Sequence, residues 1–207
     1  TLFRSGHERP IRQLKFSPDG KYIFSASSDR KVIKWDYRNS SKEFIYEHQA
    51  SVNVICISNS NKYMFIGDST GCIYVWDITT NEFIKKIAFD KLYNITSLNI
   101  SSDDIYLIVT CSERVKNSVS FIAIYLVEDI IRRTLQEDNP DKPKNVLQIP
   151  SMANKSIKSE PAPNIYKKIE CKETNVKYIK SCFTNMNKSI LISREDGILE
   201  MYDFIND

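Results

Sequence analysis

The residue types needed for a nucleophilic triad, Ser27, His7 and Asp29, lie close together near the start of the chain. In such a triad the serine attacks a carbonyl carbon, the histidine accepts the serine proton and the aspartate orients the histidine. However, Ser27 is not part of the G-x-S-x-G sequence that exposes a nucleophile on a sharp turn, and no run of glycines is nearby to supply oxyanion donors. The sequence therefore predicts that these residues are not catalytic and that the protein is not an enzyme.

Other residue combinations that could hold a cofactor or a metal ion are also missing. The chain contains five cysteines: Cys56, Cys72, Cys111, Cys171 and Cys182. None belongs to a C-x-x-C pair, and none has a histidine at ligand spacing. Only five glycines occur, and they form no loop of the kind that binds nucleotide phosphates. We therefore expect no cofactor, no metal ion and cysteines that remain reduced.

A repeated pattern organises the elements that carry these residues. An offset of 41 residues separates His7 from His48 and Trp35 from Trp76. A third and a fourth copy are weaker, and in the fourth Tyr202-Asp203 takes the place of Trp35-Asp36. The copies cover about residues 6–46, 47–88, 91–127 and 165–207. Such a period indicates similar units that stack on one another to bury a shared core.

Short β-rich runs and turn residues alternate within each copy. In the first copy, Ser17-Pro18-Asp19-Gly20 favours a type I turn between runs that begin at Ile11 and Lys21. Four such runs in 41 residues, together with GH and WD dipeptides, are the signature of the WD40 β-propeller. The sequence therefore predicts an all-β fold with four blades' worth of a WD40 propeller. We interpret it as the N-terminal part of a seven-bladed ring, with Leu2 to Ser5 as an outer strand that completes the last blade.

One segment does not fit the repeat. Residues 128–159 are polar and rich in proline, as in Asn139-Pro140 and Lys142-Pro143. This composition predicts a flexible insertion between the third strand and the outer strand of the third copy. Within it, Ile130 to Gln136 could form one or two helical turns. Both a docking motif and a tolerated surface insertion remain open for this segment.

The resemblance to WD propellers implies a structural role for the triad-like residues. In that family the histidine of the GH dipeptide binds an aspartate in the turn between the second and third strands. A serine and a tryptophan of those strands extend the network, and a fully satisfied buried network specifies one geometry. The resemblance implies such a structural network for residues of the first two copies: His7, Ser27, Asp29, Trp35, His48 and Trp76. In the second copy Asp68 and Thr70 replace Ser27 and Asp29, so we expect the network to be degraded there and packing to stabilise the later blades.

Blade geometry places the exposed recognition positions on the loop rim of the first copy, near Arg9, Ser28 and Arg30. The first copy is also basic, and this favours either an ordinary solvated face or attraction to RNA or an acidic protein surface. The whole chain has 29 basic and 26 acidic residues, and this balance argues against nucleic-acid binding by the whole domain. The longest apolar stretch, Val119 to Val127, is too short to cross a membrane.

A narrower resemblance is visible at the start of the chain. Gly6-His7-Glu8-Arg9 after a short strand resembles the opening of the WD-repeat i subunit family of eukaryotic translation initiation factor three. The phenylalanine-containing run Val119 to Tyr125, and Glu160-Pro161 ahead of the next outer strand, are similar to that family as well. The chain departs from the pattern where Glu47-His48 replaces a second GH and where the polar insertion is unusually long.

This resemblance implies a non-catalytic scaffold of the cytoplasmic initiation factor three complex. Its partners would be other subunits, chiefly the b and g subunits, and indirectly the small ribosomal subunit. Two alternatives stay open: a WD-repeat platform that binds a peptide in another intracellular assembly, and a module that contacts RNA through its basic first blade.

Overall fold

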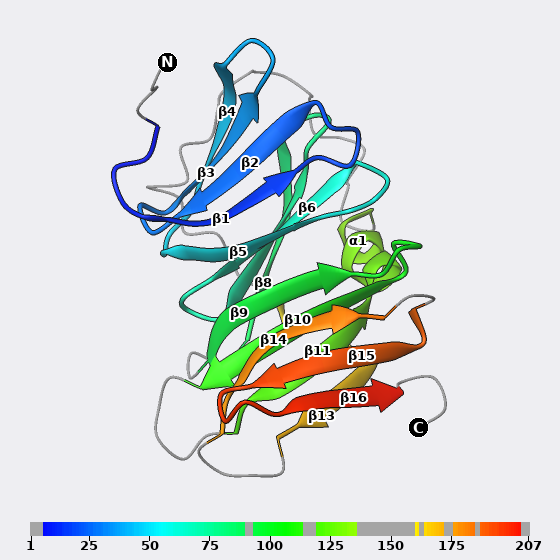
Figure 1. Cartoon of the computed structure of the whole chain (residues 1–207). Helices are drawn as coiled ribbons and strands as arrows, with labels where there is room; N and C mark the ends of the chain where they lie inside the picture. The colour runs from blue at the N-terminus through cyan, green and yellow to red at the C-terminus, as the bar shows by residue number, and fades with distance from the viewer. Residues whose placement is uncertain are drawn as a thin grey trace.

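The computed structural model describes residues 6–89, 93–113, 119–135, 160–161, 164–171, 176–184 and 187–203. The strands of these residues form four sheets, which we call blades 1 to 4 in chain order (Figure 1). Within each blade, strands that follow one another in the chain pair in an antiparallel manner. The outer strand expected at Leu2 to Ser5 lies outside the described residues.

Blades 1 and 2 follow the first two copies of the repeat. Blade 1 consists of β1 (Ile11–Phe16), β2 (Tyr22–Ser27), β3 (Lys31–Asp36) and β4 (Ser41–Glu47). Blade 2 consists of β5 (Val52–Ile57), β6 (Tyr63–Asp68), β7 (Cys72–Asp77) and β8 (Glu82–Ala88). A short fifth strand, β12 (Glu160–Pro161), pairs in parallel with the outer strand β8.

Blades 3 and 4 follow the two weaker copies. Blade 3 consists of β9 (Tyr93–Ile100), β10 (Tyr106–Glu113), β11 (Phe121–Leu126) and the outer strand β13 (Lys167–Glu170). The described part of blade 4 consists of β14 (Tyr178–Phe183), β15 (Ser189–Arg194) and β16 (Leu199–Asp203). The first strands of neighbouring blades contact one another, β1 with β5, β5 with β9 and β9 with β14. We call these four the inner strands.

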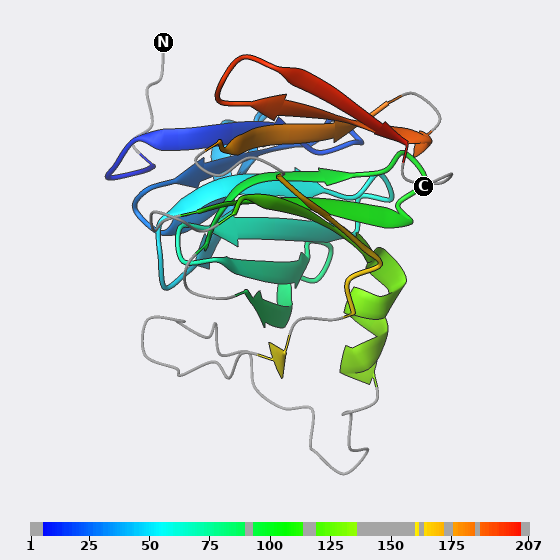
Figure 2. The same ribbon diagram turned by 90° about the horizontal axis from the view of Figure 1, so that it is seen from below.

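The polar segment after β11 begins with a helix rather than with flexible chain. Helix α1 (Val127–Leu135) starts directly after β11 and has Glu128 and Asp129 in its first turn, where carboxylates favour a helix N-terminus. Ile130 is fully buried, and its backbone carbonyl accepts a hydrogen bond from the ammonium group of Lys85 at 3.3 Å. Figure 2 shows α1 and β12 on the same side of the molecule. The first residues of the predicted insertion are therefore packed, and 136–159 lie outside the described residues.

The turn between the first two strands has the same construction in every blade. Its last residue has a positive φ and donates its N–H to the carbonyl of the first residue, and the pairs are Gly20 to Ser17, Asn61 to Ser58, Asp104 to Ser101 and Asn187 to Thr184. Glycine, asparagine and aspartate tolerate this left-handed conformation better than other residues. The turns predicted at these four places are confirmed.

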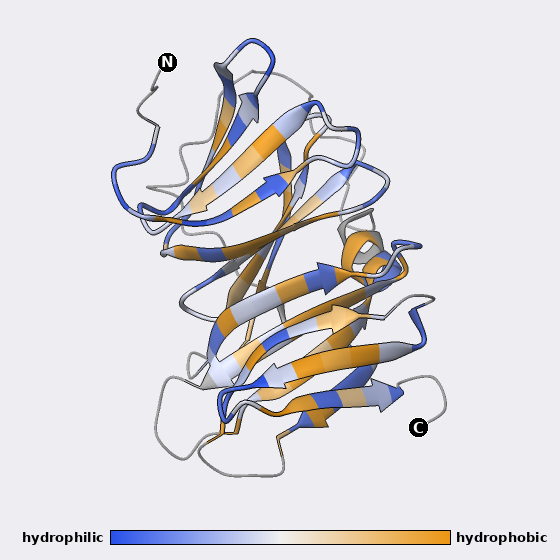
Figure 3. Ribbon diagram, in the orientation of Figure 1, coloured by the Kyte–Doolittle hydropathy of each residue, from blue (hydrophilic) through white to orange (hydrophobic). Residues whose placement is uncertain are grey.

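Three hydrophobic layers lie between successive blades. Alternation along β5 explains how one strand serves two layers: Ile55 and Ile57 pack towards blade 1, whereas Val54 and Cys56 pack towards blade 3. A third layer, which includes Ile108 and Ile190, joins blades 3 and 4. Figure 3 shows hydrophobic positions along the strands of all four sheets. Each interior blade thus needs a neighbour on both faces.

The two end blades each have an apolar face that no neighbour covers among the described parts of the chain. On blade 1, Leu14 and Phe16 are 60% and 65% exposed. On blade 4, Leu199 and Met201 are 65% and 73% exposed. Exposed apolar residues that gather on one face commonly mark a surface that another structural element covers. We call these two surfaces the open faces.

Candidate functional site

The first candidate site is a hydrogen-bonded chain at the rim of blade 1. The Nδ1 atom of His7 lies 2.8 Å from an Asp29 carboxylate oxygen, and its Nε2 atom lies 2.7 Å from Ser25 Oγ. The indole N–H of Trp35 donates to the same Ser25 oxygen at 2.8 Å. These contacts join the segment before β1 to β2, β3 and the turn between them. The chain of contacts fixes the loop at the rim.

The Asp29 carboxylate is the anionic end of this chain. Burial alone raises its pKa, but hydrogen bonds from the Glu8 backbone N–H and the His7 ring act in the opposite direction. The Lys31 backbone N–H also donates to Asp29, at 3.0 Å. Together these donors hold the pKa of Asp29 below its ordinary value. The carboxylate is therefore ionised at neutral pH and anchors both ends of the loop.

Ser25, rather than the expected Ser27, connects His7 and Trp35. Ser27 instead donates its hydroxyl to the backbone carbonyls of Arg9 and Pro10, at 3.0 and 3.1 Å. Side chains along a strand point alternately to its two faces, so Ser25 and Ser27 lie on the same face of β2. Which of the two contacts His7 therefore depends on their distances from the histidine ring. The Asp29 backbone N–H donates to the Ser27 hydroxyl at 3.2 Å, so Ser27 belongs to the network through Asp29 rather than between His7 and Trp35.

The order aspartate, histidine, serine has the contacts of a catalytic triad, yet its surroundings do not suit acyl transfer. Ser25 is 1% exposed, and its oxygen already accepts the Trp35 N–H. The His7 side chain is 3% exposed. A substrate carbonyl has no access to a nucleophile that is covered in this way. In this conformation the arrangement holds a loop together.

Blade 2 has the same residue types without the network. The two ring nitrogens of His48 and the indole N–H of Trp76 are buried and have no hydrogen-bond partner among the residues that the structure describes. The His48 ring instead packs edge-to-face against Tyr74, with ring centres 4.7 Å apart. Complete burial lowers the pKa of His48 to about 3, so the ring is neutral at physiological pH. His48 and Trp76 therefore contribute to blade 2 by packing, in line with the degraded network expected for the second copy.

The proposed recognition positions lie around the blade 1 network. Arg9 and Arg30 are exposed, and Arg30 adopts a positive φ of 71° at the end of its turn. Ser28 is half-buried, and its hydroxyl accepts a hydrogen bond from the Arg12 guanidinium at 2.7 Å. The network beneath thus fixes the backbone from which these two cationic side chains project.

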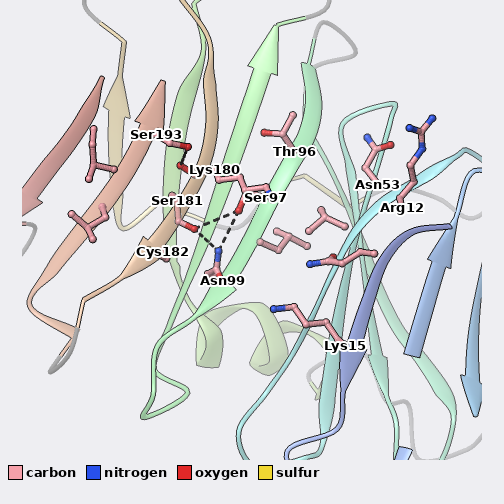
Figure 4. Close-up of a pocket in the computed structure, with 15 residues that line it drawn as sticks. Arg12, Lys15, Asn53, Thr96, Ser97, Asn99, Lys180, Ser181, Cys182 and Ser193 are labelled. Atoms are coloured by element: carbon pink, nitrogen blue, oxygen red, sulfur yellow. Dashed lines mark hydrogen bonds between the residues drawn. The ribbon is translucent and has the colours of Figure 1, made fainter. Parts of the chain in front are cut away.

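A second candidate site is a groove of about 420 Å³ along the inner strands (Figure 4). Its lining comes from all four copies of the repeat, so no single stretch of the sequence indicates it. Its cations are Arg12 and Lys15 from β1 and Lys180 from β14, and none of the fifteen lining residues is acidic or aromatic. We call it the inner groove.

Side-chain amides tie the inner strands of neighbouring blades together along this groove. Gln13 of β1 accepts the backbone N–H of Ile55 in β5 at 2.6 Å. Asn53 of β5 donates to the backbone carbonyl of Ile95 in β9 at 3.2 Å. Asn99 of β9 likewise donates to the backbone carbonyl of Ser181 in β14. We call these three contacts the amide clasps. They hold the walls of the groove in register.

Two classes of site are not formed by the described residues. Across those segments, no three His, Cys, Asp or Glu side chains come together in a way that could hold a metal ion. In the same part of the chain, no helix is both long enough and apolar enough to cross a membrane.

Comparison with protein families gives a direct match for the first two copies. A family model described as "WD domain, G-beta repeat" matches residues 1–36 and 39–77. The match includes the strands from β1 to β7 in the first two blades. A solved structure titled as the C-terminal WD40 domain of Sif2 superposes on 97% of the chain and 47% of that protein, with a TM-score of 0.68 and 15% identity. The fold is therefore that of a WD40 propeller, formed over part of its extent.

Curated relatives share one name. "Eukaryotic translation initiation factor 3 subunit I" of Aspergillus terreus is 26% identical over 98% of this chain and 52% of its own length. The Schizosaccharomyces pombe protein of that name is 27% identical over 55% of this chain and 34% of its own length. The Aspergillus niger protein is 33% identical over 41% of this chain and 25% of its own length. The chain spans about half the length of the curated relatives that match nearly all of it.

Proposed function

We propose that this protein is a non-catalytic scaffold of the translation initiation factor 3 complex in the cytoplasm, in the place of subunit I. The observation that carries the proposal is the similarity to the Aspergillus terreus subunit over 98% of the chain, which runs through all four blades. The rigid network below Arg9 and Arg30 supports it, because a fixed rim presents contact residues to partners without reorganisation. The partners are the b and g subunits, and the small ribosomal subunit is reached indirectly.

We further infer that the four blades belong to a larger ring of seven. The open faces of blades 1 and 4 support this, because further blades would cover Phe16 and Met201 as the interior blades cover one another. The relatives are about twice as long as the matched region, and this leaves room for such blades. The intact mass of the protein purified from its own cells is expected to exceed 24.0 kDa. A mass of 24.0 kDa would overturn the inference.

Affinity purification from the protein's own cells tests the scaffold role. The tagged protein is captured under mild conditions, and the co-purifying proteins are quantified by mass spectrometry. We expect the b and g subunits in near-stoichiometric amounts. Recovery of an unrelated assembly without initiation factor subunits would contradict the proposal.

A matched pair of variants tests whether the rim takes part. Arg9→Glu combined with Arg30→Glu reverses two exposed rim charges, whereas Lys21→Glu combined with Arg38→Glu makes the same charge change elsewhere on blade 1. We expect the b and g subunits to be lost from the material that co-purifies with the first variant and to be retained with the second. Equal recovery with both variants would place the contacts outside the rim.

A further inference from the structure

The inner groove collects positive charge without a matching negative group. Lys15 and Arg12 lie on its β1 side and Lys180 on its β14 side, with residues of β5 and β9 between them (Figure 4). Within the described residues, no carboxylate forms an ion pair with any of these three side chains. Cations held together without counter-charges repel one another and attract anions. The positive charge of the groove therefore favours a ligand with more than one negative charge.

The shape of the groove favours an extended ligand over a small anion. Its volume of about 420 Å³ is far larger than a single phosphate or sulfate ion, and its cations lie at opposite sides, separated by two inner strands. One small anion cannot contact both sides at once. A chain that carries several separated negative groups can.

The lining also discriminates between peptide and nucleic acid. Proteins that bind single-stranded nucleic acid stack bases on aromatic side chains, and none of the fifteen lining residues is aromatic. In contrast, the hydroxyl side chains of Thr96 and Ser193 line the groove. Hydroxyl groups both donate and accept hydrogen bonds, so they suit the backbone of an extended peptide and need no stacked bases.

We propose that the inner groove binds an acidic peptide segment in an extended conformation, with its carboxylates at Lys15 and Arg12 on one side and at Lys180 on the other. This inference does not depend on which assembly the protein joins. The peptide lies across the inner strands, between the walls that the amide clasps hold in place, and electrostatic attraction speeds its association.

Fluorescence anisotropy tests the proposal with a labelled decapeptide of alternating glutamate and serine. The same peptide with glutamine in place of glutamate is the first control, and a labelled ten-nucleotide oligouridine is the second. We expect the glutamate peptide to bind, with an affinity that falls as salt is added, and the glutamine peptide to bind at least about tenfold more weakly. No binding of the glutamate peptide at low salt, or tighter binding of the oligouridine at the same salt, would overturn the proposal.

Two double variants of equal charge locate the binding site. Lys15→Glu combined with Lys180→Glu alters the groove, whereas Lys21→Glu combined with Lys188→Glu alters exposed lysines outside it. We expect the groove variant to bind the glutamate peptide at least about tenfold more weakly than the unmodified protein does. The affinity of the control variant for this peptide should change less than about twofold. Equal weakening by both would show attraction to net charge alone and would contradict the groove. The milder pair Lys15→Gln and Lys180→Gln gives the same test if the reversed charges prevent folding.

Discussion

The side-chain carbonyl of Gln13 accepts the backbone N–H of Ile55 at 2.6 Å across the boundary between blades 1 and 2. Ile55 is fully buried, and its N–H points away from the strands of its own sheet that would otherwise pair with it. A buried donor without an acceptor loses its hydration energy without replacement. The contact therefore satisfies a backbone group of one blade with a side chain of the next.

Gln13→Leu is expected to lower the free energy of unfolding by about 1–3 kcal/mol, because it leaves the Ile55 N–H without its acceptor. Gln13→Glu keeps an acceptor oxygen at the same distance along the side chain and is expected to retain most of the stability. Urea unfolding followed by circular dichroism measures both. Equal midpoints for the leucine variant and the unmodified protein would show that the contact contributes nothing.

Ser25→Ala is expected to lower the free energy of unfolding by about 1–3 kcal/mol, because the Trp35 indole N–H and His7 Nε2 both lose their partner. Ser28→Ala is the matched control, since the Ser28 hydroxyl meets only an exposed arginine, and less than about 1 kcal/mol is expected. His7→Ala should reduce the melting temperature as Ser25→Ala does. If Ser28→Ala destabilised the protein more than Ser25→Ala, the network would not be the anchor of the loop.

The stability of the protein should depend on pH because His48 is buried. Its pKa is about 3 in the folded chain and ordinarily 6.5, so the unfolded chain binds a proton that the folded chain excludes. The contribution of this ring to stability is therefore complete above about pH 6.5 and is lost as the pH falls from there towards 3. His48→Phe removes the titration and is expected to flatten the fall in melting temperature between pH 7 and 4.5. At pH 7 the stability of this variant should differ by less than about 1 kcal/mol, because the ring nitrogens have no hydrogen-bond partners to lose within the described segments.

The control for that experiment is the remaining histidine. The sequence contains two histidines, and His7 is hydrogen-bonded through both ring nitrogens. His7 is therefore left unchanged in every variant of this experiment. His48→Gln is a second variant that does not titrate. Identical pH profiles for the unmodified protein and both variants would contradict the assigned burial.

Gly67→Ala is expected to lower the free energy of unfolding by about 1–3 kcal/mol through overpacking. A methyl group at Gly67 would lie 2.8 Å from Val54 Cγ1 and would overlap the side chain of Ile95 in the next blade. Gly20→Asn is the matched glycine control, because nothing lies near its position and Asn61 and Asn187 adopt the same positive φ in other blades. Thermal unfolding should give a clearly lower melting temperature for Gly67→Ala than for Gly20→Asn. Similar decreases in melting temperature for both variants would show that the blades are not tightly spaced at Gly67.

Much of the fold follows from the sequence because each copy of the repeat contains residues whose local conformational preferences mark turns and strands. The turn residues at Gly20, Asn61, Asp104 and Asn187 occupy left-handed positions that few residue types accept, so each one marks a strand boundary. The alternation of Ile55 and Cys56 likewise indicates a strand with two buried faces. These signals need no knowledge of distant contacts.

The candidate sites were less predictable because they depend on which of two similar residues meets a distant partner. Ser25 and Ser27 share a face, and only the three-dimensional position of His7 separates them. His48 repeats the residue type of His7, yet its ring meets Tyr74 instead of a carboxylate. The inner groove assembles residues from four blades, so no window of sequence contains it. Asn53 carried one detectable signal, because it is a polar amide in the otherwise apolar run of β5.

The parallel strand β12 affects the order in which the protein can be completed during synthesis. Glu160 pairs with Ile87 of blade 2, yet β12 follows blade 3's β11 in the chain, so the sheet of blade 2 gains its fifth strand only after three strands of blade 3 exist. This pairing raises the contact order of an otherwise local architecture, and contacts of high contact order form late because the intervening chain must first be confined. The fifth strand of blade 2 is therefore added only after the chain has continued into blade 3.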